Sequence, residues 1–141
     1  APSRAPALPG AGPTMAPPAG LDPLLPVALV ALAAVLVRAV WFTPVEAMQG
    51  PAQKIFYVHV PAAVIALYVA TPILAITSGL YLWLKDPRLD RMAESAAEVG
   101  AVFMGVVLIT GPLWGKPVWG TWWTWDARLT LTLFTFFVFL G

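Results

Sequence analysis

The chain has 141 residues, of which 60% are hydrophobic and only 11% are charged, and its mean hydropathy is +0.81. A domain of this size buries only about two-thirds of the surface of its unfolded chain, so a water-soluble fold is excluded and a lipid bilayer must cover the apolar side chains. The net charge of +1 excludes nucleic acid as the partner, while the absence of cysteine and the single histidine exclude disulfides, iron–sulfur clusters and multi-histidine metal sites.

The N-terminal stretch is rich in Ala and Pro, with six prolines in the first eighteen positions. Prolines at that density break helices and remove donors from strands, so residues 1–23 are predicted to be a disordered tail. A signal peptide is the weaker alternative, because Arg4 is the only basic residue there. The rest of the chain, residues 24–141, is predicted to be a membrane domain.

Four hydrophobic segments follow. Leu24 to Phe42 is long enough to span a bilayer, and Ile55 to Leu84 is about thirty residues, or roughly 45 Å of helix, which implies tilt or a protruding end. Ala93 to Leu113 is a third span, and a fourth hydrophobic helix from Ala127 reaches only ~20 Å by Gly141. We expect an all-α, polytopic membrane helix bundle with three full transmembrane helices and a truncated fourth. An unfinished span would expose backbone groups to lipid, so we expect a fragment of a longer protein.

Three polar segments connect these spans. Thr43 to Lys54 is predicted to be a short loop, Lys85 to Arg91 a tight charged turn in which Pro87 stops the helix, and Trp114 to Asp126 a second loop. Two spans separate the two loops, so both emerge on one face of the membrane. His59, near the start of the second span, therefore opens toward the tryptophan-rich loop.

Five of the seven tryptophans fall within twelve residues, namely Trp114, Trp119, Trp122, Trp123 and Trp125. One or two would be explained by an interfacial aromatic belt, since indole rings favour the headgroup region. Five in one loop, interleaved with glycine and threonine, favour instead a broad apolar shelf whose N–H groups can still donate hydrogen bonds. Such a shelf suits a large planar ligand.

Two charged residues of this region, Asp126 and Arg128, each have two alternative roles. Asp126 is an N-cap for the helix that starts at Ala127, or it positions the loop through Arg128 or a tryptophan N–H. Arg128 is a snorkelling interface residue, or it binds an anionic group through its bidentate fork, and Lys116 is a weaker candidate for the same role.

A lone histidine is more often a satisfied polar residue than a ligand. His59, however, lies in a segment with few polar residues, where an ionisable side chain is costly and tends to be functional. Neutral imidazole is a common axial ligand of heme iron. One histidine, a tryptophan shelf and a nearby arginine form a coherent set for heme.

Two stretches carry a resemblance to a known family. The run Gly111 to Thr130, GPLWGKPVWGTWWTWDARLT, resembles the tryptophan-rich WWD signature of heme-handling membrane proteins, in the form typical of the CcmC type, or heme exporter protein C, of cytochrome c maturation. The stretch Lys54 to Ala63, KIFYVHVPAA, resembles the start of that family's second helix. With the spacing of the spans, the resemblance covers residues 24–141.

The resemblance implies a six-helix protein of the bacterial inner membrane that binds heme b at its periplasmic face and presents it to the heme chaperone CcmE. Further implied partners are the small subunit CcmD and the ABC-transporter subunits CcmA and CcmB. The resemblance implies that His59 is an axial ligand of the heme iron and that Arg128 contacts a propionate or a partner. It implies a platform at the heme edge formed by Trp114, Trp119, Trp122, Trp123, Trp125 and Asp126. The family's second heme histidine lies in a later outer loop that this chain does not reach.

Heme binding and delivery is the function that the sequence favours, and we do not expect an enzyme, because no acid–base pair or nucleophile constellation is visible. The alternative is a structural membrane subunit whose tryptophan-rich loop docks a partner protein of an export or assembly complex. A transporter segment is disfavoured, because Glu98 is the one intramembrane acid and paired Gly/Pro breaks are missing from the spans.

Overall fold

The computed structural model describes residues 23–141, so the tail expected over residues 1–23 lies, except for Pro23, outside the described residues. The described residues divide into two units, residues 23–34 and residues 35–141. Within the described part the secondary structure is helical, apart from an isolated bridge between Glu46 and Gly50. The prediction of an all-α protein is therefore confirmed.

The first helix, α1 (Leu24–Val37), continues into a π-helical turn, η1 (Arg38–Phe42), and together they form a 19-residue apolar helix. No residue of α1 is buried. A helix that is apolar all round and unburied is typical of a segment that faces lipid.

The second helix is continuous over 34 residues, from Pro51 to Leu84. It is assembled from a 3-10 turn η2 (Pro51–Ile55), α2 (Phe56–Val64), a π-helical segment η3 (Ile65–Ala70) and α3 (Thr71–Leu84). Pro72 has no N–H to donate, and the Thr71 hydroxyl donates to the Ala66 carbonyl at 2.8 Å. The wider π-helical turn thus precedes a proline that interrupts the α-helical bonding.

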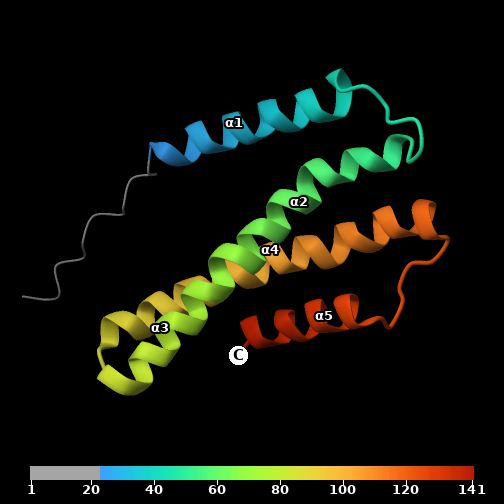
Figure 1. Ribbon diagram of the computed structural model, residues 1–141. Coiled ribbons are helices and arrows are strands. Elements are labelled where there is room, and N and C mark those ends of the chain that lie inside the picture. The colour runs from blue at the N-terminus through green and yellow to red at the C-terminus, as the bar shows by residue number, and fades with distance from the viewer. Residues whose placement is uncertain (1–22) are drawn as a thin grey trace, which may run out of the picture. The chain divides into compact units, whose positions relative to one another are not determined.

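Two further helices complete the second unit, α4 (Pro87–Trp119) and α5 (Ala127–Phe139). Helix α4 contacts η2, α2, η3 and α3 as well as α5. Figure 1 shows the second helix crossing α4, and α5 running beside the C-terminal half of α4. By length and composition the described residues contain three helices that could cross a membrane and a shorter apolar one, α5. This confirms the predicted number of spans.

The boundaries of the connecting segments differ from the prediction. Pro87 does not stop a helix but occupies the first turn of α4, where its missing N–H is harmless, and only Lys85 and Asp86 separate α3 from α4. The loop expected from Trp114 begins only at Gly120, because α4 continues through Pro112 and Pro117 to Trp119. Gly120, with φ at 78°, adopts the left-handed conformation that ends the helix. The strong stop signal is this glycine, since proline inside a membrane helix is tolerated.

The core of the second unit lies between the second helix, α4 and α5. Small residues four apart on α2 and η3, namely Ala62, Ala66 and Ala70, meet Met104 and Val107 of α4 and Phe139 of α5. Alanines at this spacing form one helix face and let another helix approach closely. Met104 is fully buried in this contact.

The end of α5 is fixed to α4 by a glycine. A Cβ atom at Gly100 would lie 2.2 Å from Cε1 of Phe139, a distance that real Cβ contacts essentially never show. Phe139 itself is 5% exposed. The phenyl ring therefore occupies the space that a side chain at position 100 would fill, and this contact sets the position of α5 along α4.

Candidate functional site

A cavity of about 320 Å³ lies at the end of the second unit where α2, the C-terminal part of α4 and the start of α5 meet. Its volume is at the lower end of the range of small-molecule sites. The lining is mostly apolar and aromatic, and it includes His59 and Arg128. The remaining lining residues are Phe56, Ala63, Leu67, Val107, Leu108, Gly111, Pro112, Trp114, Gly115, Trp119, Thr121, Trp122, Trp123, Thr124, Leu129 and Thr132.

His59 projects from α2 and is half-buried. Its Nδ1 lies 2.8 Å from Oγ1 of Thr110 on α4, so one ring nitrogen is engaged in a hydrogen bond between the two helices. A Cβ atom at Gly111 would lie 3.6 Å from Cε1 of the imidazole, an ordinary van der Waals distance, so the ring packs beside this part of α4. The imidazole is held at the cavity by its hydrogen bond to α4.

Aromatic rings from two helices form a connected row beside His59. The ring centroids of Phe56 and Trp114 are 4.8 Å apart, and those of Trp114 and Trp119 are 4.7 Å apart with the rings nearly perpendicular. The indole N–H of Trp114 donates to Oε1 of Gln49 at 3.1 Å. The tilted pair of Phe56 and Trp114 and the edge-to-face pair of Trp114 and Trp119 stabilise a defined ring orientation, so the row is a structured surface.

The loop between α4 and α5, residues 120–126, is held by hydrogen bonds from a side chain of α4 and from a side chain of the loop. Nζ of Lys116 donates to the Gly120 carbonyl at 2.9 Å, and the hydroxyl of Thr121 donates to the Trp123 carbonyl at 3.0 Å. The rings of Trp123 and Trp125 are nearly perpendicular, with centroids 5.7 Å apart. Nε1 of Trp123 is buried and finds no hydrogen-bond partner within residues 23–141. A buried donor without a partner is costly, and Trp123 is also one of the residues that line the cavity.

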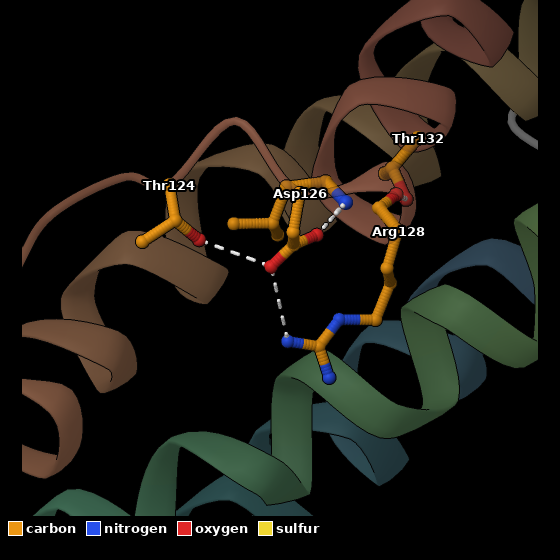
Figure 2. Close-up of polar contacts among 5 residues, drawn as sticks. Thr124, Asp126, Arg128 and Thr132 are labelled. Atoms are coloured by element: carbon orange, nitrogen blue, oxygen red, sulfur yellow. Dashed lines mark hydrogen bonds and ion pairs between the residues drawn. The ribbon is translucent and has the colours of Figure 1, made fainter.

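Asp126 is the N-cap of α5, which is one of the two roles that the sequence suggests for it. Its carboxylate accepts from the Leu129 N–H at 2.8 Å and from the Thr124 hydroxyl at 3.0 Å (Figure 2). The Leu129 N–H is the main cause of a pKa below the ordinary value of an aspartate, and the Thr124 hydroxyl and the Arg128 charge lower the pKa further. Asp126 is therefore an N-cap that also fastens the end of the loop.

Arg128 is oriented by two neighbours. Its guanidinium lies 3.8 Å from the Asp126 carboxylate, as Figure 2 shows, and 5.0 Å from the ring centroid of Trp119. Both partners of the ion pair are exposed, so the pair contributes little to stability. Stacking on an indole leaves the guanidinium N–H groups available, and Arg128 lines the cavity.

The structure brings most of the predicted site residues to one cavity. The lining includes His59, Trp114, Trp119, Trp122, Trp123 and Arg128. Trp125 and Asp126 are not among the lining residues, and Trp125 is 77% exposed. The roles assigned to these residues in the sequence analysis stay predictions.

Sequence reasoning missed three residues of the site. Phe56 lies three positions before His59, so helical spacing could have placed it on the same face. Thr110 and Gln49 reach the site only through contacts between segments that are 51 and 65 residues apart in the chain. No local pattern identifies such partners.

Comparison with known proteins gives a consistent family. A family model described as heme exporter protein C matches residues 17–141. A putative cytochrome c biosynthesis ccmC-like mitochondrial protein of Marchantia polymorpha is 47% identical over 105 residues, which cover 73% of this chain and 45% of the relative. Heme exporter protein C of Bradyrhizobium diazoefficiens is 40% identical over 119 residues, covering 84% of this chain and 45% of the relative. Heme exporter protein C of Haemophilus influenzae is 42% identical over 115 residues, which cover 80% of this chain and 46% of the relative. The chain spans about half the length of the curated relatives it matches.

Proposed function

The chain belongs to the heme exporter protein C family, and from this we propose that it forms the heme-binding part of a multi-pass membrane protein that delivers heme during c-type cytochrome biogenesis. The observation that carries the proposal is the cavity, in which one imidazole, four indole rings and one guanidinium meet. A lone imidazole suits an iron ion that a porphyrin already holds. Aromatic faces suit the planar apolar ring, and the guanidinium suits its carboxylates.

Six residues of the cavity have a role in this proposal. His59 binds the iron as an axial ligand, while Trp114, Trp119 and Trp122 pack on the apolar ring. The unpartnered N–H of Trp123 donates to a propionate, which is also the partner of Arg128. Heme b supplies the iron and the conjugated ring that carry the redox and bond-forming chemistry. The polypeptide binds and orients this cargo, and no catalytic residue is part of the proposal.

We place the site at the periplasmic face of the bacterial inner membrane. The receiving protein in this proposal is the heme chaperone CcmE, and the further partners are CcmD and the ABC-transporter subunits CcmA and CcmB. The exposed Trp125, which lies beside the cavity residues in the chain but does not line the cavity, favours a docking role for the same loop. Aromatic side chains exposed on a fixed loop are typical of protein interfaces. Docking is therefore a second function that Trp125 serves independently of heme.

The test is a heme titration of the protein purified in detergent after expression from its complete gene. His59→Ala should abolish the Soret band or shift it. Trp123→Phe keeps an aromatic ring and removes the N–H, so it should weaken heme binding by about 10-fold or more, as expected for a hydrogen bond to a charged group. Trp83→Phe is the matched control, because Trp83 is 82% exposed on α3 and does not line the cavity.

Heme binding with unchanged affinity and spectrum in His59→Ala would show that the proposed ligand is wrong. The docking function has its own assay, co-purification of the heme chaperone with the membrane protein. Trp125→Ala should reduce co-purification while its heme titration stays like that of the wild type. Equal co-purification would exclude this role for Trp125.

A further inference from the structure

The hydroxyl of Thr110 lies within hydrogen-bond distance of one ring nitrogen of His59. Oγ1 of Thr110 donates to the Val106 carbonyl one helical turn earlier, at 2.7 Å, and lies 2.8 Å from Nδ1 of His59. A hydroxyl has one proton but two lone pairs. With its proton on the Val106 carbonyl, Thr110 can only accept from the imidazole. An imidazole that donates to this oxygen carries its proton on Nδ1 and keeps the lone pair of Nε2.

The same contact fixes the rotation of the ring. His59 is on α2 and Thr110 is on α4, so the hydrogen bond couples the imidazole to the helix that carries Trp114. A Cβ atom at the neighbouring Gly111 would make an ordinary van der Waals contact with Cε1 of the ring, at 3.6 Å, so the ring lies close to this part of α4. The hydrogen bond thus holds the imidazole beside α4.

We propose that Thr110 is a positioning residue for heme: by accepting the Nδ1 proton it fixes the tautomer of His59 that offers Nε2 to the iron, and it raises the basicity of that nitrogen. The inference rests on the proposed function, in which His59 is the axial ligand. Thr110 does not line the cavity. Its effect on heme therefore passes through His59.

Three substitutions in the protein expressed from its complete gene test the inference. Thr110→Val keeps the shape of the side chain and removes the acceptor, whereas Thr110→Ser keeps the hydroxyl. Thr77→Val is the matched control, because the buried Thr77 makes the same bond to a carbonyl one turn earlier, that of Ile73 at 2.7 Å, on a part of α3 that does not line the cavity.

Heme affinity and the midpoint potential of the bound heme are measured for each variant. Thr110→Val should bind heme about 10–100-fold more weakly, as is typical for the loss of a hydrogen-bond partner of a metal-binding histidine. Its midpoint potential should shift to more positive values, because a less basic imidazole stabilises ferric iron less. Thr110→Ser should restore both values, and Thr77→Val should leave both unchanged.

The outcomes separate this inference from the proposed function. Wild-type affinity and potential in Thr110→Val would overturn the role of Thr110, while loss of heme in His59→Ala would still support His59 as the ligand. Unchanged binding in His59→Ala would overturn both. If Thr110→Val does not fold, nitrogen-15 NMR of the heme-free wild type decides, with the His59 signals identified by their loss in His59→Gln. A proton on Nδ1 supports the inference, and a proton on Nε2 overturns it.

Discussion

Replacing Gly100 of α4 by alanine should push the C-terminal end of α5 away from α4. The added methyl group would lie 2.2 Å from Cε1 and 2.5 Å from two further carbons of the Phe139 ring, whereas ordinary contacts begin near 3.4 Å. The ring would have to move by roughly 1 Å within a packed core, which costs about 1–3 kcal/mol of unfolding free energy. Because Arg128, Leu129 and Thr132 of α5 line the cavity, a displaced helix should also weaken heme binding.

A double-mutant cycle with Phe139→Ala isolates this contact. Phe139 is buried against α4, so its truncation alone should cost about 3–5 kcal/mol. In the truncated background the methyl group at position 100 meets no ring, and the gain in helix propensity, up to about 1 kcal/mol, remains. The coupling energy between the two positions should therefore be about 1–3 kcal/mol.

The assay is unfolding of the purified protein in mixed micelles with a rising fraction of sodium dodecyl sulfate, followed by tryptophan fluorescence. Gly79→Ala on α3 is the control, because a Cβ atom at Gly79 would have no neighbour within 4 Å. That variant should be as stable as the wild type or slightly more stable. If Gly100→Ala unfolds at the same detergent fraction as Gly79→Ala, the reasoning about Phe139 is refuted.

Two further predictions concern the site. Trp114→Phe removes the indole N–H that donates to Gln49 and should lower the unfolding free energy by about 0.5–1.5 kcal/mol in the same assay, with Trp83→Phe unchanged as its control. Hydrogen bonds lower the pKa of Asp126, so its carboxylate stabilises the fold above the ordinary pKa of 3.8, and this stabilisation is lost as the pH falls through the lowered value. Asp126→Ala should therefore have a lower free energy of unfolding than the wild type at neutral pH. In an acid titration of folding, the difference between the two free energies should disappear below pH 3.8. A constant difference down to the lowest pH would contradict this cause.

Those parts of the fold that depend on local composition were predicted correctly. The apolar runs around Leu24 to Phe42 and Ile55 to Leu84 form long helices, because only a helix satisfies its own backbone in lipid. The cap at Asp126 is one of the two roles that the sequence left open for this residue, since an aspartate directly before an apolar periodic run satisfies the free N–H groups of the first turn.

The length of α4 was predicted wrongly for a local reason as well. Proline and several tryptophans after Leu113 suggested a loop, whereas Pro112 and Pro117 are accommodated and Trp114 and Trp119 project from the last turns of the helix. The five tryptophans therefore do not form a single loop, because Trp114 and Trp119 belong to α4. Trp119 stands one and a half turns beyond Trp114 and meets it edge to face, so these two rings are ordered by a helix and not by a loop.

The partner of His59 could not be predicted, because it depends on the register between α2 and α4. A shift of one helical turn along α4 would place Val106 or Trp114 opposite the imidazole, and neither side chain can accept a hydrogen bond. The register is set by apolar packing between the helices, chiefly the alanines of α2 and η3 against Met104 and Val107. The hydrogen-bond partner of His59 thus follows from packing that begins at Ala62, less than one helical turn from His59, and extends to Ala70.

Helix α4 links the stability of the fold to the cavity through the sizes of its buried residues. Along one face the buried positions change from small, at Gly100, to large, at Met104 and Val107, and back to small, at Gly115. The large residues hold the second helix against the middle of α4. Beyond them Gly111 and Gly115 fill little space, and both line the cavity. A bundle packed evenly to its end would leave no room for a ligand, so the change from large to small side chains on α4 creates the cavity, and the aromatic rings at the next positions of α4 line it.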